Sequence, residues 1–287
     1  MDFILSYRQW GSMRHLLKLS LVLLLLAAAR PLARAAPGGQ AAPPLPLVGQ
    51  QALYALTLAA PRDNSVVAGN GQMGYEVLDA CDGWAVRQRL EMTFVDADGQ
   101  VTRTLSDYAT WEAKNGLAFR FHTLDITNGD LSDRLAGEAH LSRAGGPGEV
   151  VYSEPAHKTV RLPAGTMFPM AQTEAIILAA RAHKKFLASP LFDGTDGSGA
   201  SWSSVAIDGW DPATHPGIDQ RFPSLDGLPS TRVHVAFFSH KASAMLPDFQ
   251  IGMRYFLDGV ADGLVMNFGS FTMRGRMVHL AVLPSHC

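Results

Sequence analysis

Short runs in which apolar and polar residues alternate dominate the chain from about residue 50 onward. The longest covers 84–95, where Trp84, Val86, Leu90, Met92 and Phe94 recur at every second position or its multiple. Similar runs occupy 52–58, 74–78, 233–239, 250–257, 263–268 and 276–283. Alternation of period two is typical of strands that bury one face, and Asp-Gly or Asn-Gly pairs between the runs indicate hairpin turns. The pattern predicts a mainly β protein built from antiparallel strands.

One glycine-rich segment has the formal spacing of a dinucleotide-binding loop. The segment 69–74 reads Gly-Asn-Gly-Gln-Met-Gly. A phosphate-binding loop must open into a helix, whereas 75–78 alternates like a strand. We therefore interpret this segment as a turn and predict no nucleotide cofactor.

One segment departs from the alternation. Residues 172–187 have a helical composition and place Ile176, Ala180, His183 and Leu187 on one face. Pro169 precedes the segment and Pro190 follows it. A single amphipathic helix among many strands predicts an antiparallel sheet that curls around the helix, or an open barrel that the helix plugs.

The first 35 residues have the organisation of a secretory signal peptide. A basic leader precedes the apolar run 19–29, and Ala33-Arg34-Ala35 has the small residues that signal peptidase reads. The run is shorter than the roughly 20 apolar residues that span a membrane. Either Met1 or Met13 can begin this leader. We predict a signal peptide at 1–35, a flexible lead-in at 36–47, one domain at 48–287 and no stable membrane span after cleavage.

Export changes the charge of the chain. The whole sequence has a formal net charge of −2, and removing 1–35 takes away five basic residues and one acidic residue. The mature chain is therefore clearly acidic. Such a surface does not favour nucleic acid as a partner.

Two cysteines, Cys81 and Cys287, are present. An even number of cysteines in an exported chain favours one structural disulfide. Free thiols, or pairing between two molecules, are the alternatives. An intramolecular bond would join the end of an early strand to the last residue, and would place the first and last strands side by side.

Motifs for catalysis are weak. The sequence has no His-Glu-x-x-His or Cys-x-x-Cys spacing for zinc and no complete Gly-x-Ser-x-Gly around Ser198. Glu112, Asp125 and Asp193 are the carboxylates that a hydrolase would use if the fold brought two of them together. We predict no metal, no cofactor and no enzymatic activity.

Several longer segments, in a fixed order, carry a family resemblance. They are 79–84 (Asp-Ala-Cys-Asp-Gly-Trp), 110–116 (Thr-Trp-Glu-Ala-Lys-Asn-Gly), 162–169 (Leu-Pro-Ala-Gly-Thr-Met-Phe-Pro), 192–194 (Phe-Asp-Gly), and 258–260 with 268–271 near the end. Over 48–287 the chain resembles the EipB family, the cell envelope integrity proteins of alphaproteobacteria. The chain departs from the family at Gln172, where relatives favour histidine, and at Gln50-Gln51, where relatives favour His-Arg. The absence of both histidines weakens any metal or acid–base role.

The resemblance implies a fold, a location and a role. It implies a β-spiral, an antiparallel sheet wound into an open, barrel-like form, with a disulfide between Cys81 and Cys287. It also implies a periplasmic protein that helps to keep the envelope intact under stress, with no catalytic activity assigned.

Three functional hypotheses follow. The first is a non-enzymatic protein that binds other envelope proteins or cell-wall components. The second is a carrier of lipid or lipopeptide, with a cavity lined by Met167, Phe168, Met170, Ile176 and Ile177, although residues beside a helix more often form an ordinary core. An envelope-polymer hydrolase is the third. The residues that we expect at a ligand or partner surface are Trp84, Arg87, Arg89, Trp111, Phe168 and Asp193.

Overall fold

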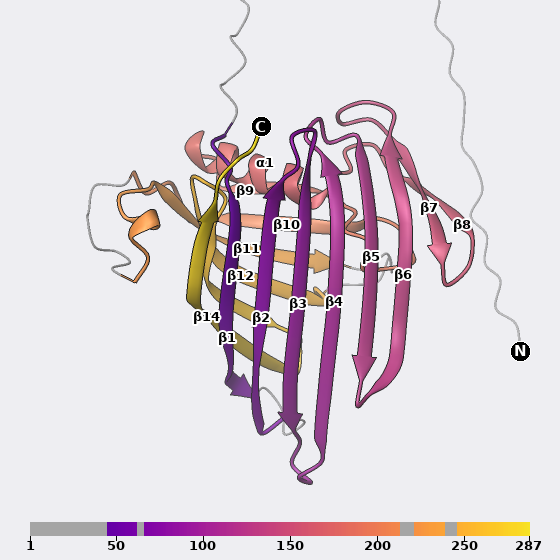
Figure 1. Ribbon diagram of the computed structural model, residues 1–287, viewed down its shortest axis with the longest axis vertical. Helices are drawn as coiled ribbons and strands as arrows, with labels where there is room; N and C mark the ends of the chain where they lie inside the picture. The colour runs from indigo at the N-terminus through magenta and orange to yellow at the C-terminus, as the bar shows by residue number, and fades with distance from the viewer. Residues whose placement is uncertain (1–44, 62–65, 213–220, 239–245) are drawn as a thin grey trace, which may run out of the picture. The chain divides into compact units, whose positions relative to one another are not determined.

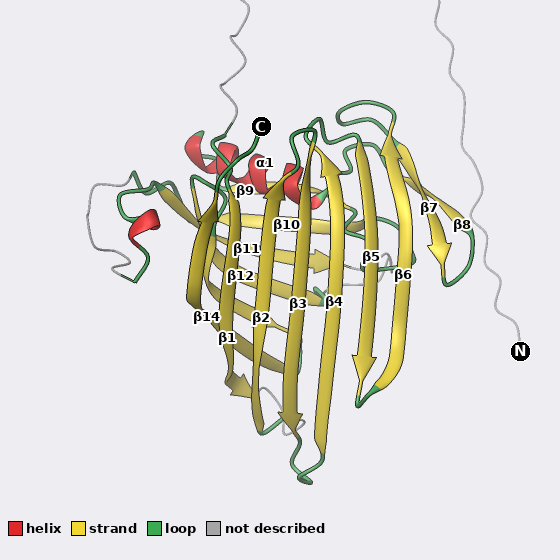
Figure 2. Cartoon of the chain, viewed as in Figure 1, coloured by secondary structure: helices red, strands yellow, loops and turns green. Residues whose placement is uncertain are grey.

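The computed structural model describes residues 45–61, 66–212, 221–238 and 246–287. These residues form fourteen strands, one α-helix and one short 3-10 helix, η1 (Figures 1 and 2). The predicted signal peptide and residues 36–44 of the lead-in lie outside the described residues. The elements are β1 (Gly49–Pro61), β2 (Ala68–Asp79), β3 (Gly83–Val95), β4 (Val101–Ala113), β5 (Ala118–Thr127), β6 (Asp130–Leu141), β7 (Gly148–Glu154), β8 (Lys158–Leu162), α1 (Pro169–Arg181), β9 (Phe186–Leu191), β10 (Ser201–Ile207), η1 (Pro223–Leu225), β11 (Ser230–Phe238), β12 (Phe249–Phe256), β13 (Ala261–Asn267) and β14 (Phe271–Leu283).

All fourteen strands belong to one antiparallel sheet in which most strands pair with their neighbours in sequence. The exception is β1, which pairs with β14 from Gly49↔Leu283 to Pro61↔Phe271 and joins the two halves of the sheet. The predicted adjacency of the first and last strands is therefore confirmed. The sheet ends at β8 on one side and β9 on the other, so it does not close into a barrel.

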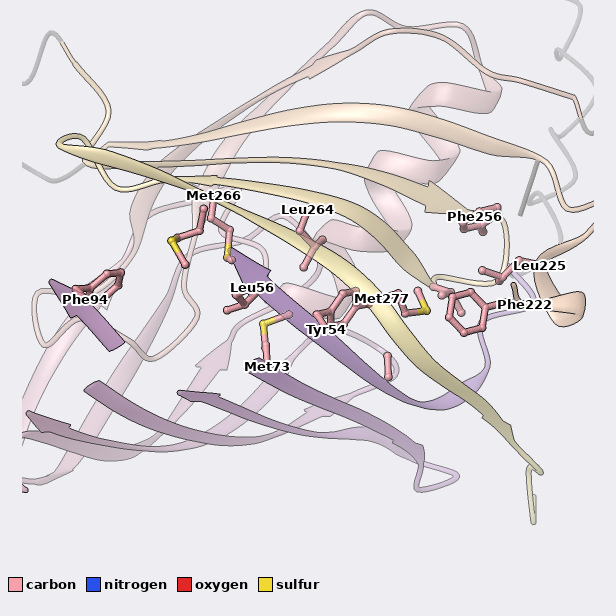
Figure 3. Close-up of a cluster of buried hydrophobic side chains, with 13 residues drawn as sticks. Tyr54, Leu56, Met73, Phe94, Phe222, Leu225, Phe256, Leu264, Met266 and Met277 are labelled. Atoms are coloured by element: carbon pink, nitrogen blue, oxygen red, sulfur yellow. The ribbon is translucent and has the colours of Figure 1, made fainter. Parts of the chain in front are cut away.

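The sheet winds so that its two halves face each other. Figure 1 shows β1 to β6 running side by side, with β9 to β12 crossing behind them at a steep angle. Side chains from both halves meet in one hydrophobic cluster, which includes Tyr54 of β1, Met73 of β2 and Met266 of β13 (Figure 3). The predicted open, barrel-like antiparallel sheet is confirmed.

The helix begins and ends earlier than predicted. Pro169 is the first residue of α1 instead of preceding it, as its fixed φ and missing N–H allow. The helix ends at Arg181, and His183 has a φ of 55°. Leu187 does not extend the helical face, because it pairs with Val205 in the sheet. Helical periodicity alone did not separate this strand residue from the helix.

The glycine-rich segment is also a strand and not a turn. Residues 69–74 lie inside β2, paired with both β1 and β3. A Cβ atom on Gly71 would come within 2.2 Å of the Glu91 carbonyl oxygen of β3. Glycine is needed here for the close approach of two strands, which is one of the roles of glycine inside a sheet.

Candidate functional site

Some side chains that point inward between the two halves of the wound sheet are not fully buried. On β3, Leu90 and Met92 point inward and pack against the main cluster, and Ile251 and Met253 of β12 do the same from the other half. All four nevertheless keep part of their surface accessible. Because protein interiors normally pack without water-sized gaps, these side chains border open space inside the sheet.

A row of polar side chains borders the same interior. Tyr75, Gln88 and Tyr108 occupy opposing positions on β2, β3 and β4, beside the buried Thr123 of β5. The Tyr108 hydroxyl donates a 2.6 Å hydrogen bond to the Asp193 carbonyl oxygen. Burial raises the pKa of Tyr108 well above its usual value. The row therefore presents neutral hydroxyl and amide groups.

The N-terminus of α1 meets this row. Tyr255 of β12 lies 3.5 Å from the Thr173 hydroxyl of α1. Burial is the main reason that the pKa of Tyr75 is raised, and the neighbouring Tyr255 and Glu112 raise it further. Since Tyr75 comes from the opposite half of the sheet, these side chains place a cluster of hydroxyl groups under the helix.

Glu112 anchors the helix to the sheet. Its carboxyl group is buried and accepts hydrogen bonds from the Met170 and Ala171 amides, at 2.7 and 2.8 Å. Burial raises the pKa of Glu112 to about 7, although both hydrogen bonds act in the opposite direction. The side chain supplies acceptors for helix amides that have no partner within the helix. Phe168, the N-cap residue, makes no such side-chain bond.

A disulfide holds the C-terminal tail, and the Ser285 hydroxyl donates a 3.3 Å hydrogen bond to the Asp79 carboxylate beside it. Cys81, in the turn after β2, is bonded to Cys287 with their Cα atoms 5.4 Å apart. Asp79 beside them accepts a hydrogen bond from the Cys81 amide at 3.0 Å and forms a 2.6 Å ion pair with Lys114. The hydrogen bond from Lys114 is the main reason that the pKa of Asp79 is lowered. The tail is thereby fixed across the end of β1 to the β2–β3 turn.

The outward face of β1 to β5 carries an open groove of about 630 Å³. Gly74 lies in its lining and leaves open space where a side chain would stand. Arg89 is held by ion pairs with Glu91 and Asp107, both within 2.9 Å. Arg87 also lines the groove, is exposed, and makes no ion pair with the residues that the structure describes.

The six residues predicted for one ligand or partner surface do not lie together. Arg87, Arg89 and Trp111 share the outward face, where Trp111 stacks against the Arg120 guanidinium at 5.1 Å. Trp84 and Phe168 are buried, and Phe168 has no exposed surface. Asp193 is not among the residues that line the groove, and its carboxylate accepts hydrogen bonds from the Thr195 amide and hydroxyl.

The residues predicted to line a lipid cavity also belong mostly to the packed core. Phe168, Met170, Ile176 and Ile177 are all buried, and Met167 is half-buried. The inward-facing residues that keep accessible surface are three tyrosines and four apolar residues of β3 and β12: Tyr75, Tyr108, Tyr255, Leu90, Met92, Ile251 and Met253. Alternation identifies their inward direction, but it does not show how far away the opposite half of the sheet lies.

Within the described ranges, no helix combines the length and apolar character needed to cross a bilayer. The fold and site define a class of protein: a wound antiparallel sheet with a partly open interior, covered at one end by a helix. The chain belongs to the EipB-like family, whose model matches residues 41–284.

Two relatives support this assignment. The chain is 30% identical over 240 residues to the Cell envelope integrity protein EipB of Brucella abortus (strain 2308), covering 82% of this chain and 84% of the relative. A crystal structure of a beta-barrel-like protein from Brucella abortus, described as a domain of unknown function, matches with a TM-score of 0.75 and 25% identity. That match covers 84% of this chain and 100% of the other.

Proposed function

We propose that this chain supports the integrity of the cell envelope from the periplasm, as a binding protein and not as an enzyme. Its similarity to a protein named for envelope integrity supports the role. The use of its buried polar groups supports binding over catalysis. Glu112 holds the amides of α1, and the hydroxyls of Tyr54 and Tyr108 hold main-chain carbonyl groups at 2.6 Å.

The ligand that we propose is an amphipathic envelope component, such as a lipid, held inside the wound sheet. The observation that carries this proposal is the accessible surface that Leu90, Met92, Ile251 and Met253 keep although they point inward. Each methylene group moved from water to such a site gains roughly 0.8 kcal/mol. The tyrosine hydroxyls beneath α1 offer neutral hydrogen-bonding groups to a polar head.

Native purification tests the proposal. The mature protein, isolated from the periplasm of a producing bacterium without detergent, is expected to carry lipid that mass spectrometry detects. Leu90→Trp fills the open space from β3 and should release this lipid. The matched control is Leu78→Trp on the outward face of β2, where Leu78 is 42% exposed, and it should retain the lipid.

The same variants connect the ligand to the envelope. In a strain that lacks this gene, Leu78→Trp should restore growth on detergent and cell-wall antibiotics, and Leu90→Trp should not. Unfolding curves of both variants establish that they are folded. Lipid-free native protein, together with full rescue by Leu90→Trp, would overturn the interior as the binding site.

A second candidate function, docking of an envelope protein or wall component, is favoured by the exposed Arg87 in the outward groove. The groove also contains Leu53, His122 and His279, so it offers both apolar and polar contacts. Arg87→Glu, included in the same rescue experiment, separates the two functions. If it fails to rescue while it still carries lipid, the groove contributes a binding function of its own.

A further inference from the structure

The outward face of β9 and β10 carries the two most exposed aromatic side chains in the described part of the chain. Phe186 is 76% exposed and Trp202 is 51% exposed. Every other phenylalanine or tryptophan that the structure describes is buried or half-buried. Large apolar side chains left in water on one surface are a mark of an interaction site.

The strand register places both side chains on the same face. Leu187 and Val205 pack into the core from the inward face, so alternation directs Phe186 and Trp202 outward. Phe186 pairs with Ala206, which lies four residues after Trp202 on β10. At the usual rise per residue, the two aromatic positions are about 13 Å apart along the strands. The side chains between them on this face are small: Ala188, Ser204 and Ala206. The result is a flat face with two protruding aromatic rings.

Basic residues lie directly before β9. Arg181 and Lys184 are exposed, and the Lys185 ammonium donates a 2.9 Å hydrogen bond to the Asp208 carbonyl oxygen. Asp208 itself is acidic and exposed, so one negative charge lies near Lys185. Three cations therefore precede Phe186 within six positions, on a chain that is acidic once its leader is removed. The positive charge is local, because these residues lie at the end of α1 and in the turn that leads directly to Phe186.

We propose that Phe186 and Trp202, with Arg181 and Lys184, form a surface that binds the anionic face of a lipid bilayer. Aromatic side chains are favoured at the boundary between lipid and water, where an apolar ring is buried beside polar head groups. Lysine and arginine beside them are attracted to anionic lipids. Charge complementarity and the flat face fit a bilayer, and β9 is an end strand of the sheet, where no further strand of the sheet covers it.

This surface is separate from the interior ligand site. It faces away from the side on which Leu187 and Val205 pack. Binding through two rings and a few charges predicts a reversible, peripheral attachment and not an insertion. The surface would bring the protein to a membrane whether or not the interior holds a lipid.

Vesicle co-sedimentation of the mature protein tests the surface. Vesicles of phosphatidylglycerol mixed with phosphatidylethanolamine should bind the protein, and phosphatidylcholine vesicles should bind it much less. Raising the salt concentration should weaken binding, because the charges are exposed. Phe186→Ser combined with Trp202→Ser should lower the affinity at least about tenfold, through the loss of apolar burial. Arg181→Gln combined with Lys184→Gln should remove the preference for anionic vesicles.

The control is Val265→Ser combined with Val278→Ser, two exposed apolar residues on β13 and β14 that are 40% and 42% exposed. This variant should bind vesicles as the wild type does. Equal vesicle binding by the aromatic double variant, or no binding by the wild type, would overturn the proposal. Light scattering provides a third arm: a dimer that the aromatic substitutions dissociate would assign the face to a second copy instead. Leu90→Trp should still bind vesicles, so failure of the interior site and failure of this surface are distinguishable.

Discussion

Two regions of the interior are built in opposite ways. Under β5 to β8, Phe119, Phe121, Tyr152, Phe168 and Phe192 are buried and pack ring against ring, with Phe119 and Phe168 stacked at 5.0 Å. Between β3 and β12, the inward-facing Leu90, Met92, Ile251 and Met253 keep accessible surface. We call the first the aromatic region and the second the open region. One sheet therefore supplies both a packed core and an unfilled space.

The difference shows how the two regions gain stability. The aromatic region is stabilised by burial, since aromatic pairs contribute beyond the area that they remove from water. Beside the open region, the Cys81–Cys287 bond joins the turn after β2 to the tail after β14, and the Asp79–Lys114 ion pair joins the end of β2 to the turn after β4. We infer that a covalent link compensates for packing that a ligand space excludes.

Removing the disulfide should have the largest effect. Cys81→Ser combined with Cys287→Ser frees a loop of 206 residues in the unfolded chain. The chain-entropy account predicts a loss of roughly 5 kcal/mol in the free energy of unfolding. Urea unfolding under non-reducing conditions measures the loss, and wild-type protein treated with dithiothreitol should behave like the variant.

Hydrogen exchange then locates the effect. In the disulfide variant, amides of β1, β2 and β14 should lose protection before those of β5 to β7, which the aromatic region holds. An unchanged unfolding midpoint would contradict the role of the bond. Earlier opening of β5 to β7 would contradict the inference that the disulfide stabilises the open region and burial stabilises the aromatic region.

The same substitution, leucine to alanine, in each region compares how much packing contributes to the free energy of unfolding there. Leu162 of β8 is buried in the aromatic region, so Leu162→Ala should cost about 3 kcal/mol in the free energy of unfolding. Leu90→Ala in the open region should cost below about 1 kcal/mol, because that side chain already borders accessible space. Chemical denaturation of the two variants checks the difference, and equal losses would mean that the open region is packed in solution.

Comparing Leu90 with Leu56 of β1 shows how much of the fold the sequence predicts. Leu56 and Leu90 both occur in runs identified as alternating from the sequence, and both side chains point inward. Leu56 is buried whereas Leu90 is only half-buried. Period-two patterning reports the face of a strand. The separation of the two facing halves depends on long-range winding, which no local pattern encodes.

The disulfide and the strand neighbours were predictable, because Cys81 and Cys287 leave one intramolecular pairing and that pairing constrains the topology. The prediction that Trp84 and Arg87 share one surface does not agree with the structure. The two residues lie three positions apart on one strand and therefore face opposite sides. From the sequence, Glu112 is identified only as one of three candidate carboxylates, and its contact with α1 is not predicted. Its role depends on a helix that begins 57 residues later.

Glu112 lies where the two regions meet, opposite Trp84 on β3 and Phe119 on β5. Its pKa in the folded protein, about 7, lies above the ordinary value of 4.5. The folded state therefore retains a proton that the unfolded state has already lost between these two values. Stability from this group is complete below pH 4.5, falls as the pH rises to 7, and is constant above that.

Between pH 5 and pH 7 the free energy of unfolding should fall by about 2 kcal/mol through this group. Glu112→Gln cannot ionise and should remove that part of the pH dependence, whatever constant offset the altered cap of α1 introduces. Glu149→Gln, an exposed change on β7, is the matched control and should leave the slope as in the wild type. Urea unfolding at several pH values measures all three proteins. If Glu112→Gln keeps the wild-type slope, the carboxyl group is already ionised in the folded protein at pH 5, and its hydrogen bonds to α1 outweigh its burial.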